Sequence, residues 1–205
     1  MTIQLIVLNG GSSSGKTGIA RCLQAILPRP WLSLSVDDFV DALPPSLVDS
    51  GVDSGSGSDS GSGSDSGSGA GIAFGQQGEV IVGEGFRELE AAWMAGIAAM
   101  VRAGARVIVD DVFLGGAASQ ERTRAQLEGL EVLWVGVRCD AAIVAGRELT
   151  RGDRAVGMAA SQAEIVHKGV VYDVEVDTGH AESLDCARTI AAYVKDSIAA
   201  YVKDS

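Results

Sequence analysis

The chain has 205 residues, of which 46% are hydrophobic and 21% are charged, a composition typical of one globular domain. Its formal net charge of -11 argues against the clustered basic surface that nucleic-acid binding needs, so we expect no nucleic-acid partner. No apolar run approaches the roughly 20 residues that cross a bilayer, and the N-terminus lacks a charged segment followed by a cleavage site. We therefore expect a cytoplasmic protein with no membrane partner.

Apolar runs alternate with segments of helical spacing along the chain. Strands are predicted at residues 3–8, 31–36, 106–110, 131–138 and, more weakly, 172–177. Helices are predicted at residues 16–27, 85–103, 118–128, 140–149, 157–168 and 181–195, with Gly104 just past the end of the second. The alternation predicts an α/β fold, a three-layer sandwich around a mainly parallel five-stranded sheet.

Two repetitive segments interrupt this single domain of residues 1–205. Residues 53–70 hold three near-copies of Asp-Ser-Gly-Ser-Gly-Ser, which lacks the apolar surface to fold and is predicted to be a flexible insert. Residues 71–83 follow it and predict a small hairpin turning near residues 76–78. The octapeptide at residues 190–197 recurs at 198–205, and this tandem tail is predicted to extend the last helix.

Residues 10–17 read Gly-Gly-Ser-Ser-Ser-Gly-Lys-Thr, a Walker A motif between a predicted strand and a predicted helix. Glycines let backbone amides close on phosphate oxygens, Lys16 reaches the terminal phosphates, and the Thr17 hydroxyl ligates Mg²⁺. The residues predicted to bind the nucleotide are Gly10, Gly11, Ser12, Ser13, Ser14, Gly15, Lys16 and Thr17. The cofactors expected from the motif are ATP and Mg²⁺.

Two acidic pairs follow predicted strands at the edge where parallel sheets bind ligands. Asp37, at the end of the second strand, is a candidate for accepting the proton of a substrate hydroxyl, and a helix N-cap is the alternative. Asp110, at the end of the third, is a candidate for holding Mg²⁺, orienting Thr17 or contacting the acceptor. A plain strand-terminal cap is the alternative for Asp110.

Arginines gather in residues 147–154, as expected for a kinase lid. Arg147 and Arg151 share a helical face, and Arg154 follows a Gly-Asp turn. Guanidinium groups suit the charge that develops on a transferred phosphoryl group, although surface ion pairs with Glu148 and Asp153 are an alternative. His167 and His180 have no partner at a spacing typical of metal or nucleophile chemistry, and we interpret both as surface or capping histidines.

Taken together, several stretches resemble one family. They are residues 8–19, 21–24, 110–118, 133–140, 151–154 and 172–178, and they resemble the chloramphenicol phosphotransferases. The resemblance covers nearly the whole chain apart from the Ser/Gly/Asp insert and the tandem tail. It implies a nucleoside-monophosphate-kinase-like fold and transfer of the ATP γ-phosphate to the primary hydroxyl of chloramphenicol, which inactivates the antibiotic.

The resemblance also implies roles for individual residues. Asp37 becomes the general base, Lys16, Arg151 and Arg154 stabilise the phosphate, and Asp110 lies near the acceptor. The insert departs from the family pattern beside the expected acceptor segment, which leaves the acceptor open. A kinase of another small hydroxylated metabolite and a non-catalytic nucleotide sensor are the alternatives, and a homo-oligomer is compatible with the sequence.

Overall fold

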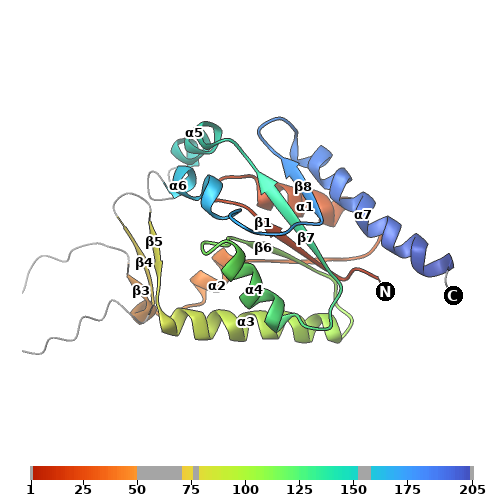
Figure 1. Cartoon of the computed structure of the whole chain (residues 1–205), viewed down its shortest axis with the longest axis horizontal. Coiled ribbons are helices and arrows are strands. Elements are labelled where there is room, and N and C mark those ends of the chain that lie inside the picture. Colours follow the sequence, from red (N-terminus) through yellow and green to blue (C-terminus); the bar gives the residue numbers. More distant parts are fainter. Residues whose placement is uncertain (1, 50–70, 76–78, 152–157, 204–205) are drawn as a thin grey trace, which may run out of the picture.

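The computed structural model describes residues 2–49, 71–75, 79–151 and 158–203 (Figure 1). Its main sheet has five strands in the order β2-β6-β1-β7-β8, and every neighbouring pair is parallel. These strands are β1 (Leu5–Asn9), β2 (Leu32–Ser35), β6 (Val107–Asp111), β7 (Val132–Arg138) and β8 (Val174–Asp177). The five-stranded parallel sheet predicted from the sequence is confirmed.

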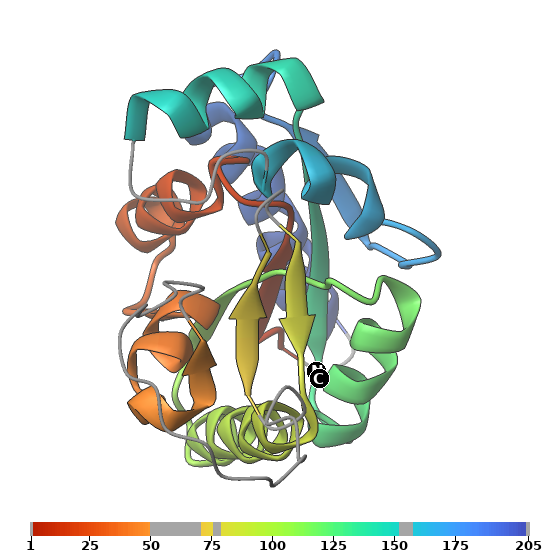
Figure 2. The same cartoon turned by 90° about the vertical axis from the view of Figure 1, so that its left-hand side faces the viewer.

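A second, small sheet contains β3 (Val48–Asp49), β4 (Ile72–Phe74) and β5 (Val80–Val82), with β3 parallel and β5 antiparallel to β4. The predicted hairpin is thus confirmed in its two strands, whereas its turn at residues 76–78 lies outside the described residues. The predicted insert at residues 53–70 lies outside them too. Figure 2 shows β4 and β5 in front of the main sheet, with α3 below and α5 and α6 above them.

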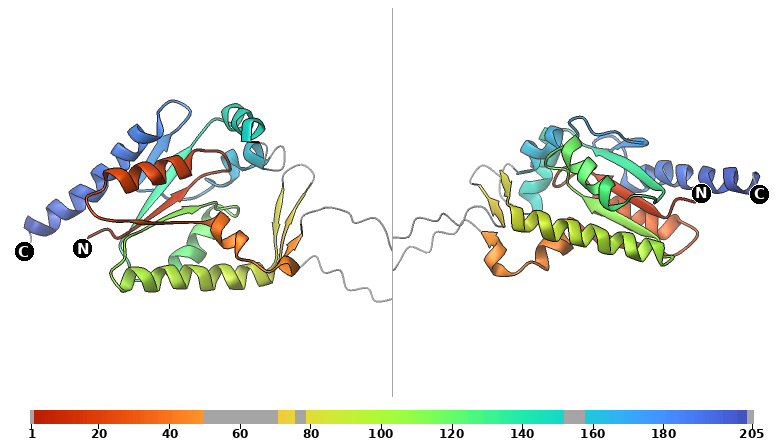
Figure 3. Two further views of the ribbon diagram at one scale, coloured as in Figure 1. Left: turned by 180° about the vertical axis from the view of Figure 1, so that it is seen from behind. Right: turned by 60° about the horizontal axis from the view of Figure 1, so that its bottom comes forward.

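Helices cover both faces of the main sheet. They are α1 (Lys16–Ile26), α2 (Val36–Asp41), α3 (Glu84–Arg102), α4 (Ala117–Gln126), α5 (Ala141–Arg151), α6 (Met158–Ile165) and α7 (Ser183–Lys203), with a 3₁₀ turn η1 (Pro45–Leu47). Helices α1 and α7 lie on one face and α3 and α4 on the other (Figure 3). In the part of the chain that is described, no helix combines the length and the apolar character needed to span a membrane.

Strand β1 is buried along its whole length, and its side chains alternate between two cores. Ile6 and Leu8 pack with α1 and α7, whereas Leu5 and Val7 pack with α3. Burial on both faces explains why β1 reads as a continuous apolar run in the sequence, since no position along it meets water. The strand therefore holds its carboxyl end, where the Walker A segment begins, in a fixed position.

Helix α3 ends as the sequence predicts. Ala103 is its C-cap, and Gly104 follows with φ +99°, a left-handed conformation that favours glycine. Helix α7 runs to Lys203, so it includes the second copy of the octapeptide up to that residue.

Candidate active site

The loop between β1 and α1 passes through the left-handed backbone region. Ser13 (φ +58°) and Gly15 (φ +89°) adopt this conformation, and α1 begins at Lys16 without a side-chain N-cap. A Cβ on Gly10 would lie 2.6 Å from the carbonyl oxygen of Val137, so this position requires glycine. The first amides of α1 therefore face the loop with the positive end of the helix dipole, an arrangement that suits an anion.

Asp110 joins the end of β6 to the loop through both of its carboxylate oxygens. Oδ2 accepts a hydrogen bond from Thr17 Oγ1 at 2.9 Å, and Oδ1 lies 3.4 Å from Lys16 Nζ. The Lys16 ammonium also donates to the carbonyl oxygens of Gly10 (2.8 Å) and Gly11 (2.9 Å), and its side chain is buried. Asp110 therefore contacts two side chains of the P-loop, Lys16 and Thr17, which a carboxylate that only caps a strand would not do.

The Thr17 hydroxyl and the Asp110 carboxylate are suited to share a divalent cation. Two neighbouring ligands of an octahedral Mg²⁺, each about 2.1 Å from the metal, are about 3.0 Å apart. The 2.9 Å between Thr17 Oγ1 and Asp110 Oδ2 matches that spacing. Within the described ranges, no cluster of three or more His, Cys, Asp or Glu side chains could hold a metal, so a cation here would take its remaining ligands from phosphate and water.

Two serine hydroxyls of the loop are buried without a protein partner. Among the described residues, Ser13 Oγ and Ser14 Oγ are the only buried side-chain oxygen or nitrogen atoms that make no hydrogen bond. A buried hydroxyl without a partner is costly unless a ligand supplies one. Phosphate oxygens supply acceptors in this position, so the two hydroxyls fit a bound nucleotide.

Residues distant in the sequence hold the loop from outside. Gln162 Oε1, on α6, accepts a hydrogen bond from the Ser12 amide at 2.8 Å, and Thr178 Oγ1 donates to the Ser14 carbonyl at 2.7 Å. Arg147 in turn donates to the carbonyl oxygen of Thr178 at 2.8 Å. The sequence signalled neither Gln162 nor Thr178 as a site residue, because each acts on the loop across more than 140 positions of the chain.

The arginine segment is described only in part. Arg151 is the last residue of α5, and Arg154 lies in residues 152–157, outside the described residues. Glu148, which was a candidate for a surface ion pair, is instead buried, and its carboxylate accepts a hydrogen bond from the Ala159 amide at the start of α6 at 2.8 Å. Glu148 is therefore not a surface residue, and its carboxylate caps a helix that lies against the P-loop.

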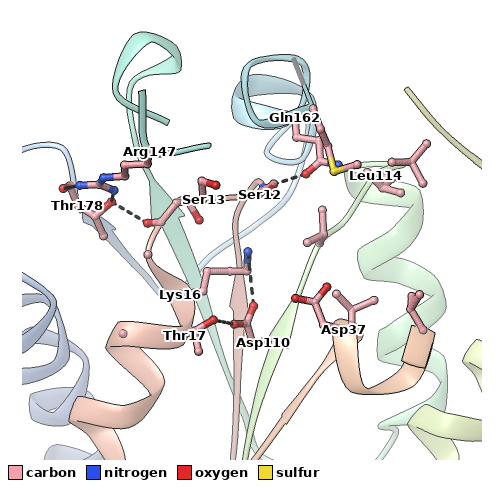
Figure 4. A pocket seen from close by; sticks show the side chains of 18 of the residues that line it. Ser12, Ser13, Lys16, Thr17, Asp37, Asp110, Leu114, Arg147, Gln162 and Thr178 are labelled. Atoms are coloured by element: carbon pink, nitrogen blue, oxygen red, sulfur yellow. Dashed lines mark hydrogen bonds and ion pairs between the residues drawn. The ribbon is translucent and has the colours of Figure 1, made fainter. Parts of the chain in front are cut away.

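Asp37 reaches the site from a helix and not from a strand end. Strand β2 ends at Ser35, which is the N-cap of α2 and forms a capping box with Asp38 (Asp38 N to Ser35 Oγ, 3.1 Å). The N-cap alternative for Asp37 is therefore wrong, since that role belongs to Ser35. In Figure 4 the Asp37 carboxylate points across the cavity toward Lys16 and Asp110.

A cavity of about 570 Å³ connects the P-loop to the small sheet. One end is bounded by the P-loop, Arg147, Thr178 and residues 181–183 at the start of α7. The other end is mainly apolar and is lined by Val36, Val40, Ile72, Val80, Val82, Phe86, Val112 and Leu114. Asp37 and Asp110 lie between the two ends, so a nucleotide and a small apolar acceptor can meet at these carboxylates.

A buried polar network supports the start of the P-loop from behind. Asn9 donates from Nδ2 to the Val166 carbonyl (2.8 Å) and to Tyr172 Oη (2.6 Å), and its Oδ1 accepts from the Phe113 amide (2.8 Å). Tyr172 Oη also lies 2.6 Å from His167 Nδ1. Asn9 is the last residue of β1 before the loop, and these bonds therefore hold the start of the loop against the segments that contain Phe113, Val166 and Tyr172.

His167 is a neutral acceptor in this network. Burial lowers its pKa to about 4, with the positive charge of Arg138 adding to the effect, so the ring is uncharged near neutral pH. Burial raises the pKa of Tyr172 to about 12, so its hydroxyl keeps the proton that it donates to Nδ1. The interpretation of His167 as a surface or capping residue is thus wrong, whereas His180, with 82% of its side chain exposed, is a surface histidine.

A Walker A loop joined to a strand-end carboxylate, at the carboxyl edge of a parallel sheet, defines a P-loop nucleotide-binding protein. The chain belongs to the family of chloramphenicol phosphotransferase-like proteins, whose model matches residues 3–195. This finding confirms the resemblance read from the sequence, and the chain is a small-molecule kinase of that family.

Individual relatives agree with this assignment. A Mycobacterium tuberculosis protein, provisionally named as an O-phosphotransferase, is 31% identical over 91% of this chain and 80% of its own length. A sugar kinase from Janibacter sp. has a TM-score of 0.60 at 17% identity, covering 94% of this chain and 98% of that one. Shikimate kinase from Acinetobacter baumannii has a TM-score of 0.57 at 17% identity, with 95% and 94% covered. The two structures confirm the fold.

Proposed function

We propose that the protein is an ATP- and Mg²⁺-dependent O-phosphotransferase that phosphorylates the primary hydroxyl of chloramphenicol or of a related aryl alcohol. One observation carries the proposal: the Asp37 carboxylate faces the Lys16–Asp110 pair across a cavity whose far end is apolar. Membership of the family supports the same acceptor. Inactivation of the antibiotic would follow from esterification of this hydroxyl.

In this reaction Asp37 accepts the hydroxyl proton as the acceptor oxygen forms its bond to phosphorus and the bond from phosphorus to ADP breaks. ATP would supply the phosphoryl group, and Mg²⁺ would neutralise charge on its phosphates. The P-loop amides, the Ser13 and Ser14 hydroxyls and Lys16 would hold the phosphates, and Thr17 with Asp110 would hold the cation. Arg151 and Arg154 stabilise the charge on the transferred group, a role proposed from the family resemblance.

The apolar end of the cavity favours this acceptor over a sugar-like metabolite. Phe86 lines that end and packs edge-on against Phe39, with ring centroids 5.1 Å apart. An aromatic body gains from contact with Phe86, whereas most of the hydroxyls of a sugar would lose their bonds to water against the apolar side chains of this end. A kinase of another hydroxylated metabolite therefore remains the second candidate only for metabolites with an apolar body.

The first experiment incubates the protein with ATP, Mg²⁺ and chloramphenicol and detects the phosphate ester by mass spectrometry. A panel of aryl and polyhydroxylated alcohols, compared by kcat/KM, identifies the preferred acceptor. Absence of any ester from any alcohol, with ATP binding intact, would contradict phosphotransfer and support a nucleotide sensor.

Asp37→Asn tests the proposed base. The change removes the proton acceptor but little volume, so kcat should fall by roughly 10²–10⁴-fold while ATP affinity stays within about twofold. Asp41→Asn is the matched control, because Asp41 is an exposed carboxylate on the same helix. Loss of ATP binding in Asp37→Asn would assign the residue to the nucleotide site instead.

A further inference from the structure

An ion pair on α3 stands in the wall of the acceptor end of the cavity. Arg87 Nη1 and Glu90 Oε2 are 2.9 Å apart, and both residues line the cavity. Their i, i+3 spacing places them on one face of the helix. About 30% of each side chain is exposed (31% and 30%), so water reaches the pair when no ligand covers it.

This pair contrasts with the apolar side chains around it. A bound acceptor that fills the apolar end also covers the pair and removes its water. Polar groups that lose water without gaining a new partner cost binding free energy, more so when they are charged. A purely hydrocarbon body is therefore a poor match for this wall, and a body with a polar group at this point is a better one.

The charges around the pair determine which polar group fits. Asp111, at the end of β6, and Arg122, on α4, both interact electrostatically with Glu90, and Arg122 also interacts with Arg87. Two carboxylates, Glu90 and Asp111, already lie near this point, so a further negative charge is unfavourable here. A positively charged group on the ligand would in turn be repelled by the guanidinium groups of Arg87 and Arg122.

We propose that Arg87 and Glu90 form a second anchor for the acceptor and select a neutral group that both donates and accepts hydrogen bonds, such as a secondary amide. The inference rests on the proposed function, because it assumes that the reacting hydroxyl lies at Asp37. Arg87 donates to the carbonyl oxygen of the amide, and Glu90 accepts from its N–H. A guanidinium has five N–H donors, so Arg87 can bind the carbonyl while it keeps its bond to Glu90.

The test compares three aryl primary alcohols that differ in one substituent: a secondary amide, a carboxylate or a methyl group. Dissociation constants are measured by calorimetry with a non-hydrolysable ATP analogue and Mg²⁺ present, for the natural protein, Arg87→Met and Glu90→Met. The natural protein should bind the amide roughly tenfold more tightly than the other two, the factor expected for one or two hydrogen bonds to charged groups. Both variants should lose this preference and bind the methyl compound as before.

The ion pair between Arg188 and Asp185 on α7 gives matched controls, because it has the same i, i+3 spacing and the same 2.9 Å separation. Arg188→Met and Asp185→Asn should retain the amide preference. Binding of the ATP analogue checks that each variant is folded, and Arg87→Lys, which keeps the charge but not the fork, replaces Arg87→Met if that variant is unfolded. Equal binding of the three alcohols by the natural protein, or an unchanged preference in the Arg87 and Glu90 variants, overturns the anchor.

Turnover of the same alcohols separates this inference from the proposed function. Selective binding of the amide without formation of an ester would contradict phosphotransfer but leave the anchor in place. Formation of the ester with an unchanged preference in the two variants would contradict the anchor alone.

Discussion

The buried, neutral state of His167 makes the stability of the protein depend on pH in a predictable direction. Its folded pKa of about 4 is lower than the 6.5 of the free side chain, so the unfolded chain binds a proton first as the pH falls. The stabilisation is complete above pH 6.5 and is lost as the pH falls toward 4. Linkage gives a loss of about 2 kcal/mol by pH 5 and about 3 kcal/mol by pH 4 from this residue.

His167→Asn isolates this contribution. An asparagine carbonyl oxygen can accept the Tyr172 hydrogen bond that His167 Nδ1 accepts at 2.6 Å, but it does not titrate. Urea unfolding followed by tryptophan fluorescence, from pH 7.5 to pH 4.5, gives the free energy of unfolding of both proteins. The free energy of unfolding of the natural protein, minus that of His167→Asn, should fall by about 2 kcal/mol from pH 7 to pH 5. The titrations of all other residues are common to both proteins and cancel in the subtraction.

Thr189→Ala is the control for this experiment. Thr189 is exposed on α7 and its side chain does not titrate, so the free energy difference between this variant and the natural protein should stay constant with pH. A difference between His167→Asn and the natural protein that is constant with pH would refute the reasoning, because it would mean that His167 titrates alike in the folded and unfolded chains.

Two further changes test the P-loop and its support. Gly10→Ala should weaken ATP binding by roughly tenfold or more, measured by calorimetry, because the new Cβ would lie 2.6 Å from the Val137 carbonyl; Gly96→Ala, where a Cβ meets no atom within 4 Å, should leave ATP binding unchanged. Glu148→Ala should lower the free energy of unfolding by about 1–3 kcal/mol, because the buried Ala159 amide loses its acceptor. Unfolding at the natural midpoint would show that this cap contributes nothing.

The parts of the site that are local in the sequence could be predicted from it. Strand β1, the P-loop and the start of α1 are contiguous, so the motif specifies a strand, a glycine turn and a helix together. Asp110 follows the same logic, because a carboxylate at the end of a parallel strand must lie at the edge where the P-loop lies. The contacts of Asp110 with Lys16 and Thr17 agree with that prediction.

The parts that depend on distant contacts could not be predicted. Nothing in the residues around His167 signals its burial. The burial depends on Tyr172, whose hydroxyl contacts His167 and also binds Asn9, 158 positions before His167 in the chain. The bond from Arg147 to Thr178, 31 positions later, could not be predicted either, although Arg147 lies in the segment expected to form a lid and lines the cavity. Strand β3 has two residues and too short a pattern to be recognised, and it exists because β4 pairs with it.

The pairing of β3 with β4 has a consequence for how this kinase can change over evolution. Val48 is the register partner of Ile72, so the chain leaves the small sheet and returns to it at neighbouring positions. The free energy of closing a loop grows only with the logarithm of its length, so segments of very different length can be accommodated there. This is a permissive point for insertion: the chain can gain or lose sequence beside its acceptor pocket while Ile72, Val80 and Val82 keep their places in the wall.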